Sequence, residues 1–363
     1  MDTNVVRKTI REHVDFSGKT IYLGLDVHKR KWSVSVYVGD VFYQTFQQDS
    51  VAVNLLNYLQ RHFPGGRYMA CYEAGFCGFS IYRDLVSLGI DCLVVNPTDV
   101  PQTGKGLLGK NDSSDSKRLG VALSRGMLQG IYVPDRSTEA DRKLLRYRQR
   151  IQQMLCGHRK SLKSTLQTVG IKIPEQYDKH YWTKNFVHWV GSLDIVEPSL
   201  KAALELIVED VAYLRGRLLS TNKKIRAMSA RNSYADAYGI LVSVPGIGLI
   251  TAMTLLTEVG DIRRFESFSR FNSFIGICPS EFSSGERENK GKMTRRKHAR
   301  LRQLIIEAAW VSIRVDPALT LKFQELCAVK TKKRSIVVIA RKLLSRVYNI
   351  WMKNRLYERG VVK

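Results

Sequence analysis

Four carboxylates are the residues of this chain whose type and placement best fit a chemical role. Asp26 and Glu73 each end an apolar run that is typical of a buried strand, and Asp112 and Asp115 lie three residues apart at the start of a predicted helix. Such element ends converge on one rim of a sheet, so we expect the four side chains to lie together. Carboxylates at such short distances repel one another unless divalent cations neutralise them. This predicts a site for Mg²⁺, or Mn²⁺, and a phosphoryl-transfer reaction.

Each carboxylate also has a purely structural interpretation. Asp26 could be a turn residue that accepts hydrogen bonds from its own backbone. Asp112 and Asp115 could cap a helix and place negative charge in its first turn, as in many ordinary helices. The spacing alone leaves both interpretations open.

The elements that would position these carboxylates form a mixed sheet. The run 21–25 is apolar throughout and predicts a strand that is buried on both faces, whereas 32–37 alternates and predicts a half-buried neighbour. The further predicted strands are 41–46, 68–72 and 92–95, and the predicted helices are 51–63, 77–88 and about 112–127. Hairpin strands followed by alternating helices and strands predict an α/β domain with an RNase H-like sheet.

The rest of the chain is predicted to be helical. We expect domains at 1–132, 133–235 and 236–363, with closing helices at 302–315 and 335–357. Two long segments, 138–169 and 196–228, each carry one apolar stripe at helical spacing. They predict a helical hairpin or coiled coil, used either for assembly or only as an intramolecular core.

The final third contains a glycine turn and a dense basic run. Pro245 to Gly248 lies between two apolar helical segments; Gly246 and Gly248 could expose backbone N–H groups to a phosphate, as in a helix-hairpin-helix, or simply allow a tight turn. A Ser283-Ser284-Gly285 turn precedes the basic run, which predicts either a nucleophile beside bound phosphates or a solvated loop. The candidate nucleic-acid-binding cations are Lys105, Lys110, Arg287, Lys290, Lys292, Arg295, Arg296, Lys297 and Arg300.

Composition favours a polyanionic partner. The 363 residues carry a formal net charge of +25, and no apolar run is long enough to span a bilayer. The first residues lack the apolar core of a signal peptide, so a cytoplasmic protein is expected. Six cysteines show no metal-ligand spacing, which predicts reduced thiols.

Two groups of motifs resemble one known family. LGLDVHK, YEAGFCG and VVNPTDVPQTGKGLLGKNDSSDSKRLG are similar to the RuvC-like domain of the DEDD-type insertion-sequence transposases, the bridge-RNA-guided recombinases. GICPSEFSSGERENKGKMTRRKHARLRQLIIEAAW is similar to the second signature of that family. Asn111, Ser116 and Glu286 depart from the usual pattern, as does the KHARLR segment.

The resemblance implies a mechanism and partners. Asp26, Glu73, Asp112 and Asp115 would hold Mg²⁺, and Ser284 would attack DNA to form a phosphoserine, with Ser283 as the alternative nucleophile. A structured bridge RNA would select donor and target DNA, and a dimer or tetramer would share composite active sites. The residues also leave room for a RuvC-like nuclease that uses water as nucleophile, or for a non-catalytic nucleic-acid-binding scaffold.

Overall fold

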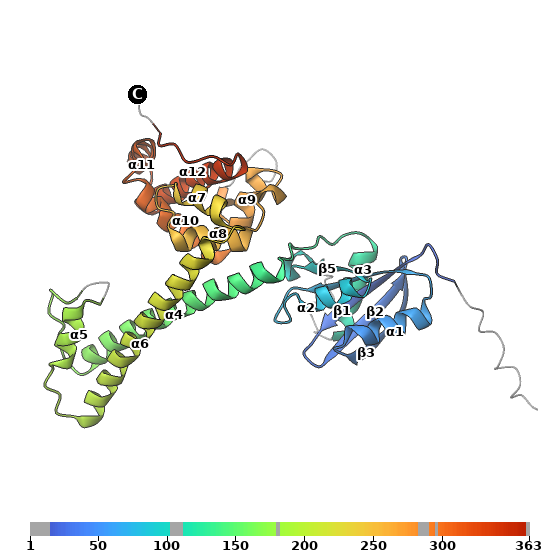
Figure 1. Ribbon diagram of the computed structural model, residues 1–363, viewed down its shortest axis with the longest axis horizontal. Coiled ribbons are helices and arrows are strands. Elements are labelled where there is room, and N and C mark those ends of the chain that lie inside the picture. The colour runs from blue at the N-terminus through green and yellow to red at the C-terminus, as the bar shows by residue number, and fades with distance from the viewer. Residues whose placement is uncertain (1–14, 102–111, 179–181, 282–289, 295–296, 361–363) are drawn as a thin grey trace, which may run out of the picture. The chain divides into compact units, whose positions relative to one another are not determined.

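The chain folds into two compact units, Met1–Val133 and Pro134–Lys363. The computed structural model describes residues 15–101, 112–178, 182–281, 290–294 and 297–360. Within these described ranges, strands are confined to the first unit apart from one short ribbon, and the regular elements of the second unit are otherwise helices (Figure 1). The predicted division into an α/β part followed by a helical part is confirmed.

A five-stranded mixed sheet in the order β3-β2-β1-β4-β5 forms the centre of the first unit. Its strands are β1 (Thr20–Val27), β2 (Lys31–Val38), β3 (Val41–Asp49), β4 (Arg67–Glu73) and β5 (Asp91–Val95). β1 to β3 are antiparallel neighbours, whereas β4 and β5 run parallel to β1. This is the RNase H-like arrangement that the sequence predicts.

Helices cover both faces of this sheet. Ile21, Leu23 and Leu25 of β1 pack with Leu55 of α1 (Ala52–His62) and Leu85 of α2 (Ser80–Ser87). Side chains alternate along a strand, so Tyr22, Gly24 and Asp26 face the opposite side, which is covered by α3 (Asp112–Ser124). The sheet therefore holds Asp26 under α3.

The prediction that β2 is only half-buried is wrong. Every side chain from Trp32 to Tyr37 is buried. The polar members of the alternation, Ser33 and Ser35, face α3 instead of solvent, and their hydroxyls lie 3.2 and 2.8 Å from Oγ of Ser116. Hydrogen bonding to Ser116 satisfies these hydroxyls inside the core.

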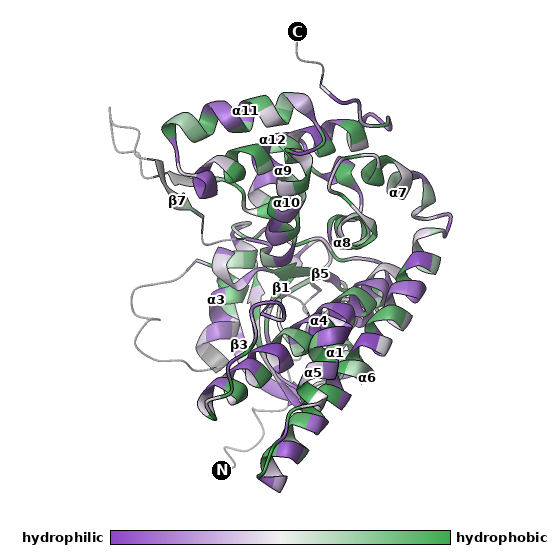
Figure 2. Cartoon of the chain, turned by 90° about the vertical axis from the view of Figure 1, so that its left-hand side faces the viewer, coloured by the Kyte–Doolittle hydropathy of each residue, from purple (hydrophilic) through white to green (hydrophobic). Residues whose placement is uncertain are grey.

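Two long helices form a hairpin in the second unit. α4 (Arg136–Thr168) and α6 (Pro198–Ser229) pack along each other, and the short helix α5 (Lys184–Gly191) joins their distal ends (Figure 1). Hydrophobic and hydrophilic segments alternate along both helices in Figure 2. Leu155 and Leu162 of α4 share one apolar cluster with Leu204 and Val211 of α6, which confirms the helical hairpin.

A second apolar cluster organises the remaining helices. These helices are α7 (Ala235–Val242), α8 (Leu249–Val259), α9 (Phe268–Ile275), α10 (Ala299–Ser312), α11 (Pro317–Val329) and α12 (Lys332–Met352), and the ribbon β6 (Pro279–Glu281) and β7 (Lys290–Met293) leads into α10. α8, α10 and α12 contribute most of the buried side chains. None of the helices in the described ranges is both long and apolar enough to cross a membrane.

Candidate active site

Asp26 and Glu73 lie side by side at the end of the two central strands. β1 and β4 run parallel, with Leu25 opposite Tyr72, so the next residue of each strand is a carboxylate. Both carboxylates face the same side of the sheet as Gly24 and Cys71, because side chains alternate along a strand. The register therefore brings together two side chains that are far apart in the sequence.

Helix α3 approaches this edge unusually closely. A Cβ at Gly24 of β1 would lie 2.0 Å from the carbonyl oxygen of Ser116, and one at Gly120 would lie 2.5 Å from the ring of Tyr37. Only glycine at these two positions lets the helix backbone rest directly on the strand. The close approach and the Ser116 hydrogen bonds fix the first turn of α3, and with it Asp115, over the end of β1.

Asp26, Glu73 and Asp115 line one pocket of about 190 Å³. His28, Phe76 and Cys77 complete part of its wall. All three carboxylates are partly exposed, so a ligand can reach them while the sheet and helix hold them in place. Asp112 is the first residue of α3, but its side chain lies outside what the structure describes.

Positive charge already lies among these carboxylates. Nη2 of Arg118 is 3.0 Å from Oε1 of Glu73 and 3.3 Å from Oδ1 of Asp115. Burial raises the pKa of Glu73 above its usual value, Arg118 opposes this, and the neighbouring charges of Asp115 and Asp26 add to it. Nε2 of His28 lies 3.3 Å from Oδ2 of Asp26.

The donor set suits a hard divalent cation. Carboxylate oxygens are the ligands that Mg²⁺ and Mn²⁺ prefer. Among the side chains that the structure describes, no three ligand groups are close enough together to hold a metal ion as they stand. The Arg118 guanidinium instead bridges two of the carboxylates, and its buried Nε has no hydrogen-bond partner among the described residues. The pocket therefore gathers three carboxylates around one described guanidinium, which leaves negative charge that a bound cation could balance.

The second predicted signature is only partly described. Ser283, Ser284, Arg287, Arg295, Arg296, Lys105 and Lys110 lie outside the described residues, and Lys290 and Lys292 belong to β7 without described side chains. Lys297 is exposed, Arg300 is half-buried, and both line a pocket in the second unit. The structure therefore brings together three of the four carboxylates and leaves the serine unplaced.

The glycine turn shows where one of its glycines is needed. Gly246 has φ +86°, and a Cβ there would lie 2.3 Å from the carbonyl oxygen of Ala308 in α10. Packing of the α7–α8 turn against α10 accounts for this glycine without any ligand. Gly248 is the N-cap of α8 and has open space around it.

Arg118 and His28 are site residues that the sequence analysis missed. Arg118 lies three residues after Asp115 on a predicted helix, which is the spacing of side chains on one helix face. That spacing was the available signal, but it does not show that the same guanidinium also reaches Glu73 on another element.

Two family models match the chain. One, described as a transposase of the DEDD IS110 type, matches residues 23–171, which include all four predicted carboxylates. The other, described as the transposase IS116/IS110/IS902 family, matches residues 238–324, which include Ser284 and the basic run. The order of the two matches is that of the two predicted signatures.

Proteins of several bacteria that are named as transposases, and one named as a pilin gene-inverting protein, are similar to this chain. The protein y4qE of Sinorhizobium fredii, named as a candidate transposase, is 30% identical over 80% of this chain and 71% of its own length. The transposase for insertion sequence element IS1533 of Leptospira borgpetersenii is 26% identical over 80% of this chain and 85% of its own length. The pilin gene-inverting protein of Moraxella bovis is 32% identical over 34% of this chain and 39% of its own length.

Proposed function

The chain belongs to the IS110 family of DEDD transposases, and we propose that it cuts and rejoins DNA strands with one set of carboxylates and one serine nucleophile. The observation that carries this proposal is the convergence of Asp26, Glu73 and Asp115 on one pocket at the end of the central strands. These are three of the four acidic residues that the resemblance implies.

The carboxylates would bind the metal and orient the scissile phosphate. Asp26, Glu73, Asp112 and Asp115 would hold Mg²⁺, or Mn²⁺, which would supply Lewis-acid activation of a DNA phosphate. Asp26 and Glu73 are held by adjacent strands, so their spacing is set by the sheet. Asp115 is held by the close packing of α3 on Gly24. Arg118 would neutralise Glu73 and Asp115 before the metal binds.

Ser284 would attack the activated phosphate, with Ser283 as the alternative. The hydroxyl oxygen forms a bond to phosphorus while the bond to the leaving DNA oxygen breaks, and the serine proton passes to a base. The resulting phosphoserine preserves the energy of the phosphodiester for rejoining to a second strand. The carboxylates and the serine lie in different units of the chain, which is compatible with an active site shared between subunits.

A structured RNA and a second copy of the chain are the proposed partners. The net charge of +25 suits a protein that contacts both RNA and DNA, with binding that weakens steeply as salt rises. Leu206, Tyr213 and Leu219 of α6 are more than half exposed, which gives the helical hairpin apolar surface for assembly into a dimer or tetramer. The backbone N–H of Gly248 would contact a phosphate, and so would the predicted cations, which include Lys297 and Arg300.

A RuvC-like nuclease is the second candidate function. The three carboxylates line their pocket with residues of the first unit alone, so water could serve as the nucleophile without Ser284. In that case DNA would be cut without a covalent protein intermediate, and Ser284→Ala would retain cleavage.

A metal-dependent cleavage assay tests the role of the carboxylates. We expect Asp115→Asn to reduce strand cleavage in Mg²⁺ by more than about 100-fold, because it removes a metal ligand. Asp40→Asn is the matched control, since Asp40 is an exposed carboxylate of the same unit outside the pocket. Equal cleavage by wild type and Asp115→Asn would refute the site.

A further inference from the structure

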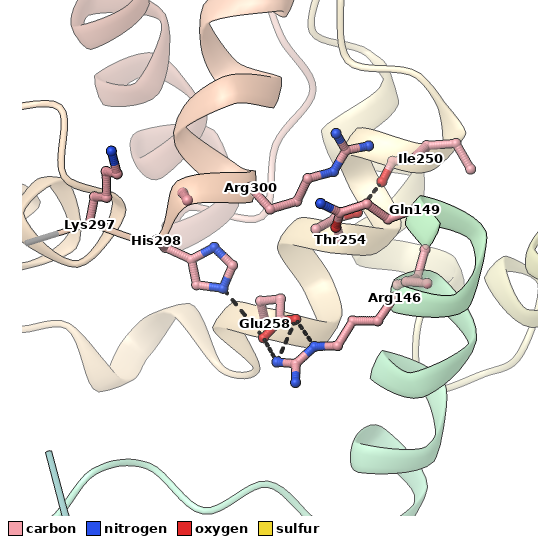
Figure 3. A pocket seen from close by; sticks show the side chains of 10 residues that line it. Arg146, Gln149, Ile250, Thr254, Glu258, Lys297, His298 and Arg300 are labelled. Carbon is pink, nitrogen blue, oxygen red and sulfur yellow. Dashed lines mark hydrogen bonds and ion pairs between the residues drawn. The ribbon is translucent and has the colours of Figure 1, made fainter. Parts of the chain in front are cut away.

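A pocket in the second unit lies where α4, α8 and the start of α10 meet. It has a volume of about 380 Å³ and is lined by cationic and polar side chains together with three apolar ones. Figure 3 shows Arg300 reaching from α10 across the pocket toward Gln149 of α4, with Arg146 and Glu258 below them. Its wall includes Lys297 to Arg300, the segment that follows the ribbon β6–β7.

Among the described residues that line this pocket, Glu258 is the only carboxylate, and it is already paired. It accepts hydrogen bonds from Nε and Nη2 of Arg146 at 3.1 and 3.0 Å, and Nε2 of His298 lies 3.5 Å away. Burial alone would raise its pKa, but the His298 hydrogen bond and the charges of Arg146 and Arg142 hold the pKa of Glu258 below its usual value. Glu258 stays ionised, and its charge is balanced by Arg142 and Arg146.

Within the part of the chain that the structure describes, Arg300 carries a positive charge without a counter-charge. No described carboxylate forms an ion pair with Arg300. Burial lowers the pKa of Arg148 on α4, and the nearby positive charge of Arg300 lowers it further. Arg148 itself donates to Oδ1 of Asn222, a neutral partner. An anion would stabilise these two guanidinium groups, which share one helix junction and have no described counter-charge.

The pocket offers several groups that recognise an anion together. Arg300 supplies a guanidinium fork that matches phosphate oxygens. Gln149 supplies amide N–H groups, and the first turn of α10, a helix of 14 residues, supplies a positive helix end. Thr254 is not free to help, because its hydroxyl donates to the carbonyl oxygen of Ile250.

We infer that this pocket binds a single backbone phosphate of the DNA strand on which the enzyme acts, with Arg300 as its principal ligand and Gln149 as a second donor. The assignment to DNA rests on the proposed function, because the pocket wall is continuous in sequence with the segment that carries Ser284. A phosphate held there would fix the register of the strand relative to that segment. The long helix α4 thereby becomes part of the DNA-binding surface.

Position-by-position neutralisation of DNA phosphates tests the inference. The probe is a fluorescent duplex from the end of the element next to the gene, bound by the full-length protein with its flanking RNA, in EDTA so that no strand is cut. One methylphosphonate is introduced at each position in turn. We expect one position at which it weakens wild-type binding by about tenfold, because a charge-assisted contact is lost.

The variants show whether this phosphate lies in the pocket. In Arg300→Gln the same methylphosphonate should weaken DNA binding by less than about twofold, because the contact is already lost. The slope of log affinity against log salt should fall by about one. Gln149→Ala should reduce the penalty without changing the slope. Arg341→Gln, which removes an exposed cation of α12 outside the pocket, should keep the full tenfold penalty.

Three results would overturn the inference. They are an unchanged methylphosphonate penalty in Arg300→Gln, loss of the penalty in Arg341→Gln as well, and a position-dependent penalty found only when the RNA strand carries the modification. Because the assay measures binding without chemistry, its outcome is separate from that of the serine mechanism. The methylphosphonate penalty could depend on Arg300 in a protein that forms no covalent adduct. That result would support the phosphate pocket and contradict only the serine mechanism.

Discussion

Arg118 and Glu73 form an ion pair inside the carboxylate pocket, with Nη2 of Arg118 3.0 Å from Oε1 of Glu73. The same nitrogen lies 3.3 Å from Asp115, so one cation balances two of the groups that would bind metal. Under the proposed function, Arg118 and a divalent cation would compete for the same carboxylates.

Removing Arg118 should strengthen the response to metal. We expect Arg118→Gln to destabilise the metal-free protein by roughly 1–3 kcal/mol, because partly buried carboxylates lose their charged hydrogen-bond donor. Mg²⁺ should then raise the melting temperature more in Arg118→Gln than in wild type, because it no longer competes with Arg118 for the carboxylates. A ligand that binds only the folded state stabilises that state. Thermal unfolding over a Mg²⁺ titration measures both effects.

Arg67→Gln is the matched control for this experiment. It removes an arginine from an exposed ion pair with Asp91 in the same unit, which should change stability by less than about 1 kcal/mol. An Arg118→Gln variant with the metal response of wild type would show that Arg118 does not compete for the metal ligands.

Gly24 should be essential for the position of α3. A methyl group at Gly24 would collide with the carbonyl oxygen of Ser116, so Gly24→Ala must push the helix away from β1. We expect a loss of about 1–3 kcal/mol of stability from overpacking, with loss of cleavage in protein that is still folded. Denaturant unfolding and the cleavage assay together separate the two effects.

Gly157→Ala provides the opposite expectation for the same chemical change. Gly157 is exposed on α4, and nothing lies within 4 Å of the position of its Cβ. The variant should be more stable by up to about 1 kcal/mol, because alanine is the better helix former. If Gly24→Ala behaved like Gly157→Ala, the close packing of α3 on β1 would be wrong.

The neighbouring positions of Asp26 and Glu73 could be predicted from sequence because the end of a strand is marked by the point at which its apolar run stops. Asp26 and Glu73 follow such runs, and a parallel register is enough to make them neighbours. The counter-charge from Arg118 could not be predicted, since it depends on the distance between α3 and β4. Ser33 and Ser35 were misplaced because a polar residue in an alternating strand normally faces water, whereas here Ser116 satisfies both.

Asp316 should make the second unit sensitive to acid. Its buried carboxylate accepts hydrogen bonds from Arg346, the Tyr357 hydroxyl and the backbone of Leu319. Burial alone would raise its pKa, but these hydrogen bonds and the charge of Arg346 hold the pKa of Asp316 below its usual value. Stability from this group is therefore fully present above about pH 4 and is lost as the pH falls through the lower folded pKa.

Unfolding measured between neutral pH and about pH 2 tests this expectation. Asp316→Asn should cost about 1–3 kcal/mol at neutral pH, and its difference from wild type should shrink as the pH falls below about 4. Asp236→Asn, at an exposed position of α7, should follow wild type throughout. A constant difference between Asp316→Asn and wild type at all pH values would contradict the assigned role.

The most direct test of the central claim is a covalent trapping experiment. Labelled donor and target DNA, the flanking RNA and Mg²⁺ are incubated with wild type, Ser284→Ala, Ser283→Ala and Asp26→Ala, and the products are separated on a denaturing gel. We predict a protein–DNA adduct in wild type and Ser283→Ala that is lost in Ser284→Ala and Asp26→Ala. Cut DNA without any adduct, formed equally well by Ser284→Ala, would contradict the serine mechanism and identify a hydrolytic nuclease.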